Sequence, residues 1–108
     1  MDCLEFKNPV FNHGLNTTVR RGDKWADLRP GSIVELRAVG NYGGQTRLWN
    51  VEILRVVIVR FADLKAQDIE HEHDPQCRTL NGLYEELTRI YPGFKRREVV
   101  TVLTFCAV

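Results

Sequence analysis

The sequence contains no long hydrophobic run, few cysteines and almost no net charge. No apolar run in its 108 residues approaches the roughly 18 residues of a membrane span, so we expect no membrane segment, and we expect no secretory leader. Cys3, Cys77 and Cys106 are too few and too widely spaced for a disulfide framework, which favours a reduced, cytoplasmic protein. With a net charge of +1, any attraction to polyanions must be local.

The bulk composition is that of an ordinary globular protein. An apolar fraction of 44% is typical of a folded domain. A chain of this size buries about two-thirds of its unfolded surface, which is enough for a core without disulfides or metals. Since the sequence has no repeat, linker or low-complexity tract, we predict a single domain over residues 1–108, and we expect a monomer.

Hydrophobic patterning predicts several strands. Residues 32–39 alternate Ile33, Glu35 and Arg37 with apolar neighbours, the pattern of a half-buried strand. The β-rich stretch 47–61 exceeds the usual strand length, so we expect a bend near Leu54–Arg55. Residues 98–106 are largely apolar and indicate a strand buried on both faces. The predicted strands are 4–6, 17–21, 32–39, 47–61 and 98–106, with a hairpin loop at 40–44.

One strong helix is expected near the C-terminus. Thr79 is a good helix N-cap, and Pro92-Gly93 ends the segment. Its apolar residues, spaced by three, four and three, are Leu80, Leu83, Leu87 and Ile90. We also predict a single helical turn capped by Asn8, a short helical connection at 62–67 and a polar loop at 68–78. The fold class is therefore α+β, a small mixed β-barrel of five to six strands with one main helix near the C-terminus.

The segment 14–25 is the best candidate for a ligand site. Its arginines offer planar forks that suit phosphate or carboxylate, although exposed charged turns are also common. Trp25 either stacks on a base or packs against the end of a barrel. The basic residues 95–97 would extend this site if they share its face. The predicted ligand-binding residues are Asn16, Thr17, Thr18, Arg20, Arg21, Lys24 and Trp25.

The loop 70–77 contains residues that can bind metal. His71, His73 and Cys77 are three possible zinc ligands. The acidic residues between them are typical of an exposed loop, and no second Cys-His pair follows at finger spacing. We therefore predict a solvated loop, with no metal and no cofactor, and regard an acid of this loop as the better candidate for a site.

Three segments resemble the ASCH domain of the PUA-like superfamily. The first is Gly14-Leu15-Asn16-Thr17-Thr18-Val19-Arg20-Arg21, and the second is Pro30-Gly31-Ser32-Ile33-Val34. The third, residues 83–93, ends in Ile90-Tyr91-Pro92-Gly93 and is similar to the helix end of small bacterial acetylcytidine amidohydrolases. The resemblance spans nearly the whole chain and implies a PUA-like β-barrel whose partners are RNA, a nucleotide or a nucleoside.

The amidohydrolases of that family use a Lys, a Thr nucleophile and a downstream Glu. Asn16 stands where the Lys is expected, and an amide cannot act as a base at neutral pH. The segment can be aligned with the family motif in two ways. One alignment places Thr18 and Arg20 on the family's Thr and Arg, whereas the other places Val19 and Arg21 there. The downstream acid is Glu70, Glu72 or Asp74, of which Glu72 fits slightly better as the later acid of an acid-x-acid pair.

The leading functional prediction is an RNA- or nucleotide-binding domain whose cleft is lined by residues 14–25. The alternative is an amidohydrolase that acts on an acylated nucleoside such as acetylcytidine, with Thr18, Asn16 and Glu72 as its catalytic set. A protein-interaction module is a third class, which an exposed apolar patch at Val10-Phe11 would favour.

Overall fold

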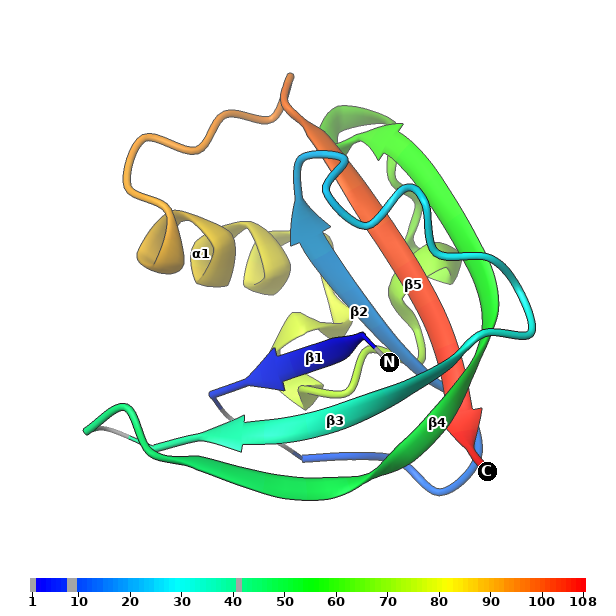
Figure 1. Cartoon of the computed structure of the whole chain (residues 1–108). Coiled ribbons are helices and arrows are strands. Elements are labelled where there is room, and N and C mark those ends of the chain that lie inside the picture. The colour runs from blue at the N-terminus through cyan, green and yellow to red at the C-terminus, as the bar shows by residue number, and fades with distance from the viewer. Residues whose placement is uncertain (1, 8–9, 41) are drawn as a thin grey trace.

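The computed structural model describes residues 2–7, 10–40 and 42–108. One five-stranded sheet has the order β1-β3-β4-β5-β2, in which β1 and β3 are parallel and the other neighbours are antiparallel. The sheet curls into a half-barrel, with the helix α1 (Leu80–Ile90) beside it (Figure 1). This confirms the predicted α+β class, a curled sheet with one main helix near the C-terminus. The strands are β1 (Cys3–Phe6), β2 (Asn16–Arg21), β3 (Ile33–Val39), β4 (Gln45–Arg60) and β5 (Val99–Ala107).

The long strand β4 curls the sheet because it serves two neighbours in succession. Its first half pairs with β3 and its second half with β5. The register with β5 shifts between Ile53 and Arg55, which confirms the bend predicted near Leu54–Arg55. A bulge increases local twist, so the two halves of β4 can follow different directions. A second shift, between Glu35 and Arg37 on β3, had no sequence signal.

The curl brings the two edge strands toward each other. β1 and β2 lie at opposite ends of the strand order. Across the gap between them, the Arg20 guanidinium donates from Nη2 to the Glu5 carbonyl oxygen at 2.9 Å. We call this gap, between Glu5–Phe6 and Thr18–Arg20, the seam. The Arg20 side chain therefore connects the edge strands β1 and β2, which a closed barrel would join by backbone hydrogen bonds.

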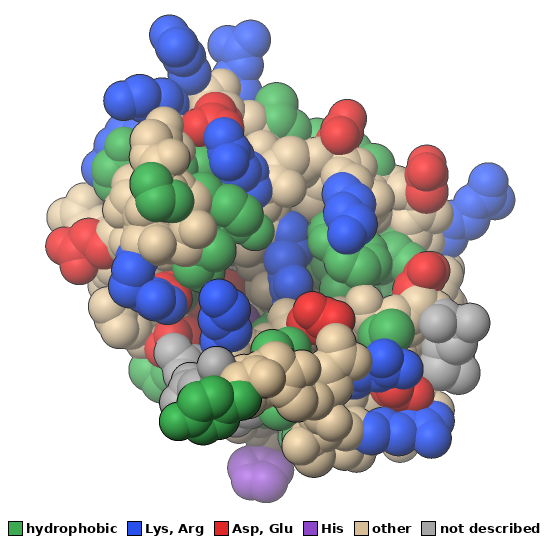
Figure 2. Space-filling view, turned by 60° about the vertical axis from the view of Figure 1, so that its left-hand side comes forward, with side chains coloured by type: hydrophobic (Ala, Val, Ile, Leu, Met, Phe, Trp, Pro, Cys, Tyr) green, Lys and Arg blue, Asp and Glu red, His purple; other side chains and the backbone are tan. Residues whose placement is uncertain are grey.

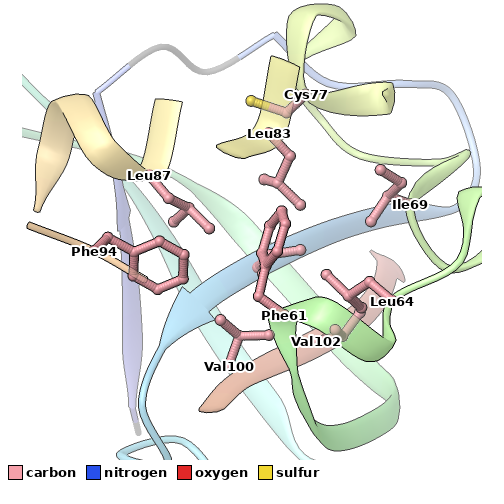
Figure 3. Close-up of a cluster of buried hydrophobic side chains, with 10 residues drawn as sticks. Phe61, Leu64, Ile69, Cys77, Leu83, Leu87, Phe94, Val100 and Val102 are labelled. Carbon is pink, nitrogen blue, oxygen red and sulfur yellow. The ribbon is translucent and has the colours of Figure 1, made fainter. Parts of the chain in front are cut away.

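Two apolar cores lie on the two faces of the sheet. The helix-side core is shown in Figure 3, where Phe61 lies among side chains from α1, β5 and the connecting turns. The barrel core is built mainly from β1, β3, β4 and β5, and partly buried Phe11 and Trp25 pack against it. The helix-side core comprises Val19, Phe61, Leu64, Ile69, Cys77, Leu83, Leu87, Phe94, Val100 and Val102, and the barrel core Leu4, Phe6, Leu28, Val34, Leu36, Val51, Ile53, Leu103 and Phe105.

The connection between β4 and α1 differs from the predicted polar loop. It contains three short 3₁₀ turns, Phe61–Asp63, Ala66–Ile69 and Pro75–Arg78. The prediction of a polar loop at 68–78 was wrong there because buried Ile69 and Cys77 anchor these turns to the helix-side core. The turn expected at Asn8 and Pro9 falls outside the described residues.

Helix α1 begins and ends where its sequence signals indicate. The Thr79 hydroxyl accepts a hydrogen bond from the Gly82 amide at 3.1 Å, and Leu83 and Leu87 face the core. The helix ends at Ile90, ahead of Pro92. No helix in the described part of the chain is long and apolar enough to cross a bilayer.

Replacing Thr79 with alanine should lower the free energy of unfolding by about 1 kcal/mol, the usual contribution of an N-cap hydroxyl. Chemical denaturation measures this loss. Thr88→Ala is the matched control, because Thr88 lies inside the same helix, where alanine is the better helix former. An equal loss in both variants would contradict a capping role for Thr79.

Candidate functional site

A cavity of about 290 Å³ opens at the seam, between the two edge strands and α1. This volume lies near the lower end of the roughly 300–1,000 Å³ that is usual for small-molecule sites. The face seen in Figure 2 is hollowed near its centre, and Lys and Arg side chains gather at its upper edge. The cavity is lined by Glu5, Phe6, Lys7, Thr18, Val19, Arg20, Val39, Glu72, His73, Asp74, Cys77, Leu83, Glu86, Leu87, Ile90 and Tyr91.

Arg20 is held in the cavity wall by three contacts. Its Nε donates to the Thr18 hydroxyl at 3.2 Å, its Nη2 donates to the Glu5 carbonyl, and its Cζ lies 4.7 Å from the centre of the Phe6 ring. Burial lowers the pKa of Arg20, while Tyr91, Glu72 and Glu5 oppose this shift. A guanidinium has five N–H donors, so three remain for a ligand.

Thr18 is buried beside Arg20, with 2% of its surface exposed. Its Oγ1 accepts the hydrogen bond from Arg20 Nε. The hydroxyl proton is therefore available to another acceptor, and the adjacent cation would stabilise negative charge on the oxygen. This arrangement suits either recognition of a ligand or attack on one.

Backbone hydrogen bonds between Thr17 and residues 71–73 place Glu72 at the cavity. The Thr17 amide donates to the His71 carbonyl at 2.8 Å, and the His73 amide donates to the Thr17 carbonyl at 2.9 Å. Residues 71–73 thus lie alongside the free edge of β2. Glu72 and Thr18, which are 54 positions apart in sequence, line the same cavity as a result.

Glu72 is a buried carboxylate with close partners. It is 2% exposed, and its Oε1 lies 2.5 Å from His73 Nδ1 and accepts from the Asp74 amide at 3.2 Å. The His73 ring meets the edge of Phe6 at a centroid distance of 4.7 Å. Buried carboxylates are rare unless they are paired, so this pair is a marked feature of the cavity wall.

Asn16 supports this wall without lining the cavity. Its Oδ1 accepts from the Asn12 amide at 2.8 Å, and its Nδ2 donates to the Asn12 carbonyl at 3.1 Å. Asn12 in turn donates to the His71 carbonyl and accepts from Arg78, whose Nε donates to the Glu72 carbonyl at 2.9 Å. The amide of Asn16 therefore helps to fix the segment that carries Glu72.

The remaining predicted residues lie around the cavity and do not line it. Thr17 is buried and contributes its backbone to the pairing with residues 71–73. Arg21 is exposed, with its Nε 2.8 Å from Glu98 Oε1 and its Cζ 5.3 Å from the Tyr91 ring. Lys24 lies over the ring of Trp25, which packs against the barrel core.

Several cavity residues carried no sequence signal. Glu5, Phe6 and Lys7 come from β1 and its end, and Tyr91 and Glu86 come from α1 and its end. Sequence spacing does not reveal that β1 and β2 meet at a seam. His73 was considered only as a metal ligand, and its pairing with Glu72 was missed.

The charges on the cavity wall are mostly negative. The acidic side chains are Glu5, Glu72, Asp74 and Glu86, and the basic ones are Lys7 and Arg20. A free phosphate inside the cavity would face several carboxylates and is disfavoured. A neutral group with N–H donors and carbonyl acceptors can instead pair with both Glu72 and Arg20.

Thiol chemistry and metal binding are the two other chemistries that these residue types could offer. Burial raises the pKa of the Cys77 thiol to about 12, with Glu72 and Asp74 adding to the shift, so the thiolate is scarce at neutral pH. Among the residues that the structure describes, no three His, Cys, Asp or Glu side chains converge as a metal site.

Comparison with solved structures confirms the predicted ASCH-like fold. An Enterococcus faecalis V583 protein of the DUF984 family has a TM-score of 0.53 at 14% identity, over 86% of this chain and 63% of that chain. An ASCH domain from Lactobacillus crispatus JV V101 has a TM-score of 0.53 at 12% identity, over 85% and 63%. The chain thus spans 63% of the length of each structure. At these identities the likeness shows the fold alone. No protein-family model matches the sequence, and no curated protein resembles it significantly.

Proposed function

We propose that the cavity binds the base of a nucleotide unit, either as a free nucleotide or within RNA. The observation that carries this proposal is the presence of Arg20 and Glu72 on one small, partly apolar cavity. A carboxylate accepts from the exocyclic amino group of cytosine, and a guanidinium donates to carbonyl oxygen and ring nitrogen. Apolar side chains such as Val19, Leu83 and Leu87 provide surface for the faces of a planar ring.

A basic rim beside the cavity supports a ligand that carries phosphate outside. We define the basic rim as Arg21, Lys24, Lys95 and Arg97. Arg21 contacts both Glu98, which follows residues 95–97, and Tyr91, which lines the cavity. The Glu98 carboxylate also accepts from the Lys95 amide, so Arg21 and the segment that carries the second basic group lie close together. The charges favour a neutral base inside and phosphate on the rim.

Titration of the protein with cytidine and with cytidine monophosphate tests this arrangement. We expect the double variant Lys95→Ala/Arg97→Ala to bind the monophosphate about 2- to 30-fold more weakly, because exposed ion pairs contribute roughly 0.2–1 kcal/mol each and two are removed. Its affinity for cytidine should not change, since the base contacts remain. Calorimetry at two salt concentrations measures both affinities, and a short cytidine-rich RNA extends the series to a strand.

Arg55→Ala is the matched control, because Arg55 is an exposed arginine of β4 that does not line the cavity. Equal losses for nucleoside and nucleotide, or a loss in the control, would contradict the basic rim. Absence of binding by every ligand at millimolar concentration would contradict the base site itself.

Hydrolysis of an acylated nucleoside is the second candidate function. Thr18 and Glu72, two of the residues that the family resemblance implies, line one cavity, and Arg20 contacts the Thr18 hydroxyl. A threonine nucleophile needs a base to take its proton. Asn16 cannot supply one, and its side chain is used in the contacts with Asn12. The readout for this function is release of acetate from acetylcytidine.

A further inference from the structure

We propose that the paired Glu72 and His73 provide the general base that hydrolysis at this cavity requires, in place of the amine missing at Asn16. This inference rests on the second candidate function. The pair lies on the cavity wall, and the side chains of Glu72 and His73 are only 2% and 14% exposed. A carboxylate that orients a histidine beside a hydroxyl nucleophile is a recurring catalytic geometry on unrelated folds.

The hydrogen bonds of His73 determine which ring nitrogen can accept a proton. Its Nδ1 lies 2.5 Å from Glu72 Oε1 and 3.3 Å from the Thr17 carbonyl oxygen, and both of these atoms are acceptors. Nδ1 must therefore carry the hydrogen in the neutral ring. The lone pair then resides on Nε2, which has no hydrogen-bond partner among the described residues.

The surroundings hold this ring in place. Phe6 packs edge-on against it at 4.7 Å, and Phe11 lies at 5.7 Å with a tilt of 32°. The Arg78 side chain and the Asn12 amide bind the carbonyls of residues 72 and 71. Rotation of the imidazole is restricted as a result, which a positioned base needs.

Thr18 provides the hydroxyl nucleophile whose proton the base would accept. Its Oγ1 already accepts from Arg20 Nε, so its proton remains to be donated. In the proposed step, this proton passes to His73 Nε2, directly or through one water, while Oγ1 bonds to the acyl carbon and the carbonyl electron pair moves onto oxygen. When the intermediate collapses, the bond between the acyl carbon and nitrogen breaks, and the proton on His73 is transferred to the leaving amine. A water then repeats the sequence and releases the acid.

Acetylcytidine hydrolysis by the full chain tests this role, with cytidine affinity measured in parallel. We expect His73→Ala to lower kcat about 100- to 10,000-fold, the usual range for a general base, with cytidine affinity within threefold of the wild type. Added imidazole should restore part of the activity. The second variant, His73→Asn, keeps an N–H donor for Glu72 but has no base, and it should be equally slow. His13→Ala is the control, because His13 is exposed and does not line the cavity.

Two results would overturn the inference, and they have different consequences. If the wild type releases acetate and both His73 variants retain kcat within threefold, the base lies elsewhere and the hydrolytic function stands. If the wild type binds cytidine but releases no acetate, the hydrolytic function fails and this inference fails with it, while the binding proposal survives. Activity lost in His73→Ala and recovered with imidazole supports the assignment.

Discussion

Replacing Arg20 with alanine should weaken the binding of cytidine and of cytidine monophosphate by about 10- to 100-fold. A hydrogen bond to a charged group contributes roughly 1.5–3 kcal/mol, and about 1.4 kcal/mol corresponds to a tenfold change in affinity. Arg20 is the cation held deepest in the seam, with three N–H donors available to a ligand. Its loss would also remove a positive charge that interacts with Glu72, and calorimetric titration measures the combined effect.

Arg20→Lys is the matched variant for this prediction. Lysine keeps the charge but lacks the planar fork that reaches the Thr18 hydroxyl and the Glu5 carbonyl together. We expect it to recover less than half of the lost binding free energy. Affinity close to that of the wild type in Arg20→Ala would show that the ligand binds outside the seam.

The second large effect is expected at Gly82, where two local rules oppose each other. Helix propensity alone predicts that Gly82→Ala stabilises α1 by about 1 kcal/mol. A Cβ at this position, however, would overlap the Gln76 carbonyl oxygen and lie 2.9 Å from the Thr79 hydroxyl oxygen. The Gln76 carbonyl belongs to the backbone and cannot move aside as the end of a flexible side chain can. The cost of the steric clash therefore exceeds the gain in helix propensity. We expect a net loss of about 2 kcal/mol in the free energy of unfolding.

The same substitution should also disturb the cavity. Relief of the clash moves the turn Pro75–Arg78 away from α1, and Cys77 of that turn lines the cavity together with Leu83. Asn81→Ala is the control, because Asn81 is an exposed position of the same helical turn. Denaturation curves that show Gly82→Ala to be as stable as Asn81→Ala would contradict the close approach of the Gln76 backbone.

Local sequence rules predicted the elements of the fold well. The 3.6-residue period and the hydroxyl of Thr79 located α1, and the excess length of the 47–61 stretch predicted the bulge near Leu54–Arg55. These features depend on neighbours within a few residues. The polar loop predicted at 68–78 was less successful, because the burial of Ile69 and Cys77 depends on tertiary packing against α1 and against β5.

The site was harder to predict because the seam is a product of long-range pairing. The family resemblance implied Thr18 and favoured Glu72 among three acids, and residue chemistry offered Arg20 and Arg21 alike. Of these residues, Thr18, Arg20 and Glu72 line one cavity together with Asp74. Sequence alone gave no sign that Phe6 faces Arg20. Nor did it distinguish Asn16, which fixes a loop, from Thr18 two positions later, which lines the cavity. Those distinctions depend on where β1 lies relative to β2.

The most direct test of the central claim, that the seam cavity binds a base, is a nuclear magnetic resonance titration with cytidine monophosphate. We predict saturable shifts in the Nε–H signal of Arg20, the ring signals of His73 and the amide signals of Thr18 and Glu72. Shifts confined to exposed residues of β4 such as Leu54 and Ile58, with those four signals unchanged at millimolar ligand, would contradict the account.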